Sequence, residues 1–135
     1  NDKKEEGYTK AMVEAKLEPM IFRTSGDTTI NKPHFETFFA DIHVDGAIAV
    51  RDSIAVSFLN TAINNGKKVP ENLKIAGFQN TKYASLARPE LTSIDIPVYD
   101  IGAVSMRLLT KLMQSQDVEN TRIILPHRII IRESI

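Results

Sequence analysis

The chain has 135 residues, a length typical of one domain, and its 42% hydrophobic and 25% charged residues are typical of a globular protein. Seventeen Lys and Arg residues balance seventeen Asp and Glu residues, which disfavours direct binding of a nucleic-acid backbone by this stretch. The absence of Cys excludes disulfides, thiolate metal sites and Cys nucleophiles. No apolar run reaches the roughly 18–20 residues of a membrane span, and residues 1–6 do not resemble a signal peptide. Because the chain begins without Met and inside a helical pattern, we expect it to be part of a longer protein.

The first third of the chain predicts helix, strand, loop and helix in that order. Residues 3–15 place apolar side chains at helical spacing, and the apolar run at 20–22 predicts a buried strand followed by a turn. The polar residues 25–32 predict a loop. Pro33 is suited to the first turn of a helix, and this helix carries apolar residues at helical spacing: Phe35, Phe38, Phe39 and Ile42.

The remainder predicts a repeated strand and helix unit. Residues 46–50 and 73–78 are apolar runs that predict buried strands. The first is followed by a helix that Asn65 and Gly66 close, and the second by a short helix near 83–86. Because the units recur, right-handed crossovers, a parallel sheet and helices on both faces are expected, which makes the fold α/β.

The last third continues this pattern and then changes. Residues 91–96 predict a further strand, and residues 99–113 predict the strongest helix. An apolar stripe follows one side of this helix: Ile101, Val104, Leu108 and Leu112. Residues 121–125 and 127–131 are β-rich runs separated by Pro126.

Polar loops follow three of the predicted parallel strands. Ligands of open parallel sheets bind beyond the carboxyl ends of the strands, so we expect these loops to meet at one crevice. The loops contain hydrogen-bonding groups and one aromatic ring: Phe22, Arg23, Thr24, Arg51, Asp52, Gln79 and Asn80. Such a set is typical of a site for a polyhydroxylated small molecule. The alternative is that Asp52 and Asn80 only cap helices.

Catalytic signatures are missing from the sequence. There is no G-x-S-x-G elbow, no phosphate-binding glycine loop and no dinucleotide fingerprint. Asp41, His43 and Asp45 alternate, which on a strand would align potential metal ligands, but they fall where a helix ends and predict solvated turn residues. For His127, an ordinary hydrogen-bonded side chain is expected. The sequence therefore predicts no enzyme, no metal and no cofactor.

Arg107 and Lys111 lie four residues apart on the last predicted helix. As a like-charge pair on one face they cost the isolated helix roughly 0.2–0.5 kcal/mol. A phosphorylated partner would relieve this repulsion, because a phosphate offers negative charge and several acceptor oxygens to an Arg fork. The alternative is a solvated basic edge on an amphipathic helix.

Two sequence stretches resemble a known family. Residues 69–81 read VPENLKIAGFQNT and residues 88–94 read RPELTSI, which resembles the VP-x-D-x-x-I-x-GFDN and RP-x-LTT stretch of the LacI/GalR family of bacterial transcription regulators. Residues 49–55 resemble the ANDxxA turn of that family. Residues 99–113, followed by the LPHR sequence at 125–128, are similar to its catabolite control branch.

The resemblance implies a two-lobed effector domain of the periplasmic-binding-protein-like type I fold. It implies that residues 3–95 and 121–135 form the second lobe, that residues 96–97 cross a hinge, and that the helix within 98–115 belongs to the first lobe. It also implies a cytoplasmic homodimer that meets operator DNA only through an amino-terminal helix-turn-helix headpiece, which this chain lacks. The rival expectation is a sugar-binding transport protein of the same fold, for which a secretion signal would be the discriminating feature.

The resemblance further implies an effector site for a sugar or sugar phosphate, formed by Lys4, Phe22, Arg23, Arg51 and Gln79. Three of these residues depart from the family pattern, because Lys4 replaces an Arg, Arg51 replaces an Asn and Gln79 replaces an Asp. Each replacement changes the charge or the donor geometry, and a Lys does not reproduce the planar fork of an Arg.

Two protein contacts are also implied by the resemblance. Arg107 and Lys111 match the positions at which catabolite control proteins meet the seryl-phosphorylated phosphocarrier protein HPr. A dimer surface is implied at four residues: Ser53, Phe58, Thr81 and Tyr83. For Phe58 and Tyr83 the alternative is a place in the core.

Overall fold

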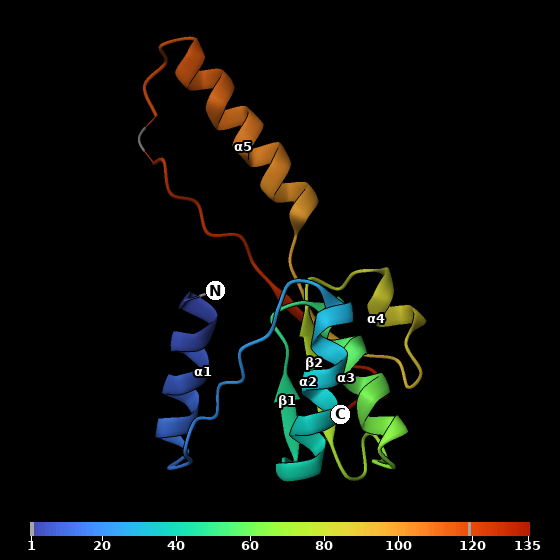
Figure 1. Ribbon diagram of the computed structural model, residues 1–135. Helices are drawn as coiled ribbons and strands as arrows, with labels where there is room; N and C mark the ends of the chain where they lie inside the picture. The colour runs from blue at the N-terminus through green and yellow to red at the C-terminus, as the bar shows by residue number, and fades with distance from the viewer. Residues whose placement is uncertain (1, 119) are drawn as a thin grey trace.

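The computed structural model describes residues 2–118 and 120–135, so the domain expected over residues 1–135 is covered except at positions 1 and 119. Figure 1 shows a body formed around a sheet, with one helix projecting away from it. The elements in chain order are α1 (Asp2–Glu14), α2 (Thr28–Asp41), β1 (Gly46–Ile48), α3 (Asp52–Asn64), β2 (Lys74–Phe78), α4 (Lys82–Leu86), β3 (Thr92–Asp95), α5 (Val98–Met113) and β4 (Arg128–Ile130).

The described strands form a sheet in the order β1-β2-β3-β4. β1 pairs in parallel with β2, and β2 pairs in parallel with β3. The helices between them act as crossovers, so the predicted α/β class is confirmed. β4 pairs antiparallel with β3, with Arg128 opposite Asp95, and this brings the last residues of the chain back to the body.

The core lies between the sheet and the helices α2 and α3. Phe35, Phe38 and Phe58 form an edge-to-face cluster, with ring centroids 5.1 Å apart for Phe35–Phe58 and 5.7 Å apart for Phe38–Phe58. Such pairs add to the free energy gained by burying the rings. Leu59 and Ile75 extend this core to the sheet and are fully buried. The buried side chains of the helices are therefore contributed mainly by α2 and α3, whereas α1 has no buried residue.

The start of α2 differs from the prediction. The helix begins at Thr28 because Asp27 caps it, with the carboxylate accepting a hydrogen bond of 2.8 Å from the backbone N–H of Thr29. Pro33 consequently lies inside the helix and does not open it. The predicted loop at 25–32 is wrong in its second half for the same reason.

Two predicted strands are absent from the described sheet. Residues 20–22 form no strand, and Phe22 packs on α2, with its ring centroid 5.1 Å from that of Phe38. The N–H of Met20 donates to the Tyr8 hydroxyl at 3.1 Å instead of to a neighbouring strand. Residues 121–125 form no strand either, because they run between α5 and the body without a partner strand (Figure 1).

The end of the chain is anchored by Ser134, which is fully buried. Its hydroxyl donates to the carbonyl of Ile75 at 2.5 Å and accepts from the N–H of Thr92 at 2.8 Å. The carbonyl of Ser134 accepts from the N–H of Ile75 at 2.8 Å. These bonds tie the segment after α5 to β2 and β3. None of the described helices has the length and hydropathy that crossing a bilayer requires.

Candidate functional site

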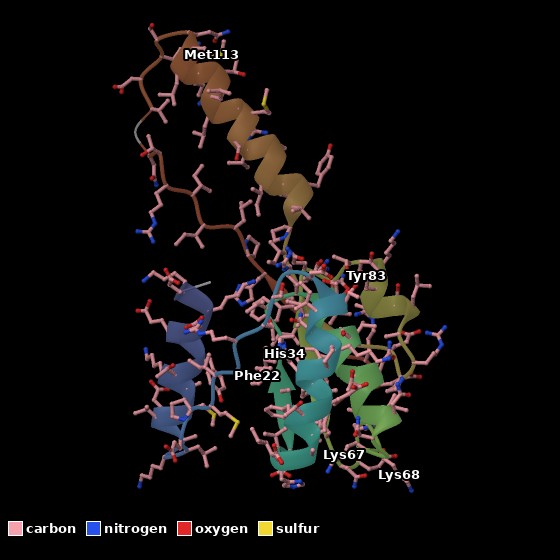
Figure 2. All side chains as sticks on the ribbon, in the orientation of Figure 1. Phe22, His34, Lys67, Lys68, Tyr83 and Met113 are labelled. Carbon is pink, nitrogen blue, oxygen red and sulfur yellow. The ribbon has the colours of Figure 1, made fainter. Side chains whose placement is uncertain are left out.

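A cavity of about 830 Å³ lies between α1, the segment 17–26 and the strands β1 and β2. Four of the five predicted effector residues line it: Lys4, Phe22, Arg23 and Arg51. Gln79 is not among its lining residues. Phe22 lies between α1 and α2 (Figure 2), and most of the other lining residues are apolar. The structure thus brings three of the predicted basic side chains and the predicted aromatic ring into the lining of one mostly apolar cavity.

Lys4 joins α1 to the ends of the strands. Its Nζ donates a hydrogen bond of 2.9 Å to the carbonyl of Val50 and lies 4.4 Å from the centroid of the Phe78 ring. Burial, and then the nearby charge of Arg51, lower the pKa of Lys4. A carbonyl and an aromatic face are neutral partners, so the charge of Lys4 is not cancelled by a carboxylate.

Arg23 is occupied by an ion pair. Both of its terminal nitrogens donate to the carboxylate of Glu5, with Nη2 at 2.9 Å from Oε2. The hydrogen bond from Arg23 lowers the pKa of Glu5, and the same bond raises that of Arg23. Arg23 therefore links the segment 17–26 to α1. Because its charge is paired with that of Glu5, it contributes no net charge to the cavity.

The side chain of Arg51 has no hydrogen bond or ion pair to another residue in the described part of the chain. It stands at the N-cap position of α3 in an extended conformation, without a side-chain cap. Its guanidinium passes close to Gly26, where an added Cβ would lie 3.1 Å from Nη2. The side chain is exposed, so its donors are available to a ligand in the cavity.

Asp52 does not cap a helix, which was the alternative expected for it. The side chain is fully buried, and Oδ2 accepts from the N–H of Thr81 at 2.6 Å and from its hydroxyl at 2.9 Å. Oδ1 accepts from the hydroxyl of Ser93 at 2.6 Å. A Cβ at Gly77 would lie 2.4 Å from Oδ1, so only glycine fits beside this carboxylate. Asp52 therefore ties the loops after β1 and β2 to β3.

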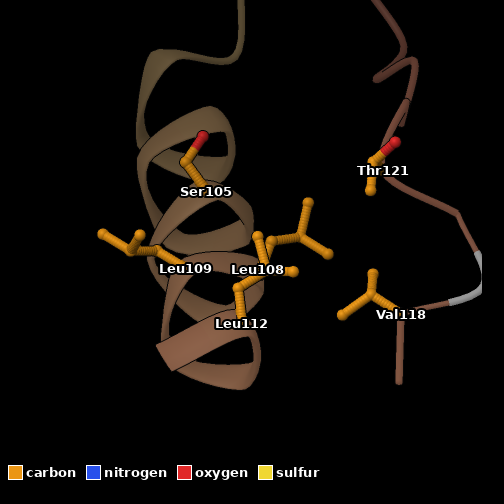
Figure 3. Close-up of a pocket in the computed structure, with 6 residues that line it drawn as sticks. All are labelled: Ser105, Leu108, Leu109, Leu112, Val118 and Thr121. Atoms are coloured by element: carbon orange, nitrogen blue, oxygen red, sulfur yellow. The ribbon is translucent and has the colours of Figure 1, made fainter. Parts of the chain in front are cut away.

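Arg107 and Lys111 are exposed on α5, and neither side chain has a hydrogen bond or ion pair to another described residue. The same helix carries a small apolar pocket of about 260 Å³ against the returning chain. Figure 3 shows Leu108 and Val118 facing each other across it. No residue of α5 is buried, and Val104 and Leu108 are half-buried on the side that faces the returning chain.

Of the candidate metal-ligating residues, Asp45 lines the cavity, whereas Asp41 and His43 do not. His43 and Asp45 are highly exposed, with 3.3 Å between Nε2 and Oδ1. In residues 2–118 and 120–135 no group of His, Asp and Glu side chains is arranged to hold a metal ion. His127 is exposed and makes no hydrogen bond to another described residue, which differs from the hydrogen-bonded side chain expected for it.

A family model described as a periplasmic binding protein-like domain matches residues 1–135. The chain belongs to this family. The match covers the whole sequence, so it includes the strands and the cavity described above as well as α5.

Relatives of the chain are named as transcription regulators, as the resemblance predicted. Catabolite control protein A of Staphylococcus epidermidis (strain ATCC 12228 / FDA PCI 1200) is 48% identical over 88 residues, which are 65% of this chain and 27% of that protein. The HTH-type transcriptional regulator pepR1 of Lactobacillus delbrueckii subsp. lactis is 46% identical over 91 residues, which are 67% of this chain and 27% of that protein. The matched part is therefore about a quarter of each relative.

Solved structures of transcription regulators are also similar to this chain. The transcription regulator CcpA of Lactococcus lactis superimposes with a TM-score of 0.85 at 36% identity, over 95% of this chain and 48% of that chain. The lac repressor dimer bound to operator and the anti-inducer ONPF superimposes with a TM-score of 0.86 at 20% identity, which shows the fold alone. The chain thus spans about half the length of these regulators.

Within this family fold, the residues expected at a dimer surface are not equally accessible. Phe58 belongs to the core, because its ring is only 7% exposed and contacts Phe35 and Phe39. Tyr83 on α4 is 48% exposed. Ser53 and Thr81 are half-buried, and Thr81 is bonded to Asp52.

Sequence reasoning missed three residues that shape the site. Asn31 is fully buried and closes the loop before α2 through two hydrogen bonds to the backbone of Ser25. Ser134 and Arg132 anchor the end of the chain on β2 and β3. A polar residue within an otherwise apolar run is the only local signal, and it does not identify a partner that is distant in sequence.

Proposed function

We propose that this chain is part of the effector-binding domain of a LacI-type transcription regulator, which controls binding of operator DNA by a separate helix-turn-helix. The observation that carries the proposal is the cavity of about 830 Å³ that extends along β1 and β2 to their carboxyl ends and is lined by Lys4, Arg23 and Arg51. The names of the relatives support regulation over transport and over catalysis. In this proposal residues 3–95 and 121–135 form the second lobe, and the helix within 98–115 packs in the first.

The proposed effector is a sugar or a sugar phosphate. Phe22 offers an aromatic face of the kind that stacks on a sugar ring, and its side chain is 43% exposed. Lys4 and Arg51 are cations without a carboxylate partner, and Arg51 stands where the family pattern has a neutral Asn. An uncancelled positive charge beside an apolar hollow favours a ligand that has both a ring and an anionic group.

Isothermal titration calorimetry of the 135-residue chain with glucose 6-phosphate and with glucose tests this assignment. We expect the phosphate ester to bind more tightly, and we expect Arg51→Gln to weaken its binding at least tenfold. Arg122→Gln is the matched control, because it removes the same charge from an exposed residue outside the cavity. Equal loss in both variants, or no binding of either sugar, would contradict the proposal.

Two protein partners are proposed with the effector. A second copy of the chain is proposed to dock on the surface of Ser53, Thr81 and Tyr83. Lobe closure would then change the affinity of the dimer for operator DNA. The seryl-phosphorylated phosphocarrier HPr is proposed to bind α5. The support for this is that Arg107 and Lys111 are exposed on one face without internal partners.

The phosphocarrier assignment is tested by the double substitution Arg107→Ala and Lys111→Ala. Binding of seryl-phosphorylated HPr should be abolished, while the circular dichroism spectrum stays unchanged. Lys67→Ala with Lys68→Ala is the matched control, since these lysines lie at the opposite end of the molecule from Met113 and α5 (Figure 2). Unchanged affinity in the first pair would overturn the assignment.

A further inference from the structure

The turn that follows β2 has an unusual backbone. Gln79 has a φ of 98° and Asn80 a φ of 49°, so two consecutive residues that are not glycine adopt positive φ angles. L-residues rarely enter this region, and Gln does so less readily than Asn. Such a conformation persists only where the surrounding structure holds it in place.

The backbone N–H groups of this turn are all engaged. The N–H of Gln79 donates to the carbonyl of Ile94 at 2.8 Å. The N–H of Asn80 donates to the hydroxyl of Ser93 at 3.0 Å, and the N–H of Thr81 donates to Asp52. The turn is therefore bonded to β3 and to the start of α3, but these bonds leave the side chain of Asn80 unexplained.

The side chain of Asn80 is held by the end of the chain. Its Oδ1 accepts a hydrogen bond of 2.6 Å from Nη2 of Arg132, and its Nδ2 donates to Oδ1 of Asp95 at 3.2 Å. The other oxygen of Asp95 accepts from Nη2 of Arg128 at 2.8 Å. One amide side chain thus joins β2, β3 and the returning segment.

Arg132 is built to be rigid. Its side chain is only 16% exposed, and its Nη1 donates to the carbonyl of Leu91 at 2.7 Å. Its backbone N–H donates to the hydroxyl of Thr92 at 2.8 Å. Because Nη1 is bonded to Leu91 and Nε lies 3.7 Å from the carboxylate of Glu90, the planar guanidinium is held so that Nη2 is directed at Asn80.

We propose that Arg132 is a positioning residue for the effector site. Through Asn80 it holds the turn 79–81 in its positive-φ conformation, and the turn fixes Gln79 and the end of β2, where Phe78 contacts Lys4 at the cavity. This inference rests on the proposed effector function for its purpose, but the contact itself is independent of any ligand. It also places the end of the chain, after β4, in direct contact with the turn 79–81.

Amide hydrogen exchange of the whole chain, measured by NMR without ligand, tests the proposal. In Arg132→Ala, exchange of the Asn80 and Thr81 amides should accelerate at least tenfold relative to the amide of the buried Leu59 in α3. A role in general stability alone would accelerate all three amides together, and that result would overturn the proposal. Arg122→Ala is the control and should change none of them.

Two further variants keep the test decisive if Arg132→Ala does not fold. Asn80→Gly removes the amide side chain but tolerates positive φ, so it should reproduce the local acceleration. Adding Arg132→Lys to Asn80→Gly should then produce no additional acceleration at the Thr81 amide, because the contact between the two side chains is already lost. Additive effects would contradict the proposal. Failure of the wild-type chain to bind glucose 6-phosphate would refute the effector function alone.

Discussion

Asp52 is a fully buried carboxylate that accepts three hydrogen bonds and has no cationic partner among the described residues. Asp52→Ala removes all three bonds at once. It leaves the N–H of the half-buried Thr81 and the hydroxyl of the fully buried Ser93 without these acceptors. The substitution therefore tests whether this carboxylate joins the loops after β1 and β2 to β3.

The expected loss of stability follows from the hydrogen-bond partners of Asp52. Hydrogen bonds to a charged group contribute about 1.5–3 kcal/mol each, and a buried donor without a partner costs about 1–3 kcal/mol. The two hydroxyls can rotate to other acceptors, whereas the N–H of Thr81 cannot. We therefore expect Asp52→Ala to lower the free energy of unfolding by about 3–5 kcal/mol.

Asp52→Asn should cost less, about 1–2 kcal/mol, because the amide oxygen still accepts from Thr81 while the charge is lost. Urea unfolding followed by circular dichroism measures both values. Asp45→Ala is the control, since the Asp45 side chain is highly exposed, and it should change stability by less than about 0.5 kcal/mol. A loss below about 1 kcal/mol in Asp52→Ala would refute the reasoning.

Two other predictions concern acid stability and self-association. Hydrogen bonds from Arg128 and then Asn80 lower the pKa of Asp95. The contribution of Asp95 to the free energy of unfolding is therefore present above its pKa in the unfolded chain. It is lost as the pH falls through its pKa in the folded chain. Asp95→Asn should flatten the fall in urea midpoint between about pH 5 and about pH 2, and an unchanged slope would argue against this pair. On α5, Leu109 and Leu112 are 50% and 53% exposed, so the chain should self-associate or bind a hydrophobic dye. Changing both leucines to Lys should reduce self-association as measured by sedimentation velocity. A monodisperse wild-type monomer that binds no dye would contradict this prediction.

The order of helices and strands was predictable because it depends on local pattern. The apolar runs at 46–50 and 73–78 contain β1 and β2, and Gly66, with a φ of 78°, ends α3 as the Asn65-Gly66 pair predicts. The long helix at 99–113 was also predicted from its period, although nothing in the period says that it would stand away from the body.

The errors arise where structure depends on partners distant in sequence. The apolar run at 20–22 has the composition of a strand, but a strand needs a neighbouring edge, and here Phe22 packs on α2 while Arg23 pairs with Glu5. Asp52 has the sequence position of a helix cap, yet its partners are 29 and 41 residues away. Capping and long-range bonding use the same side chain, so local sequence does not separate them.

The central claim is that a small anionic sugar binds where Lys4, Phe22 and Arg51 meet. The most direct measurement is an NMR titration of the isotope-labelled chain with glucose 6-phosphate, followed at the backbone amides. The account predicts saturable shifts at Lys4 and Arg51 and at the turn 79–81, with none at Lys67 or Lys68. Shifts confined to residues outside the cavity, or no shift at saturating concentration, would contradict it.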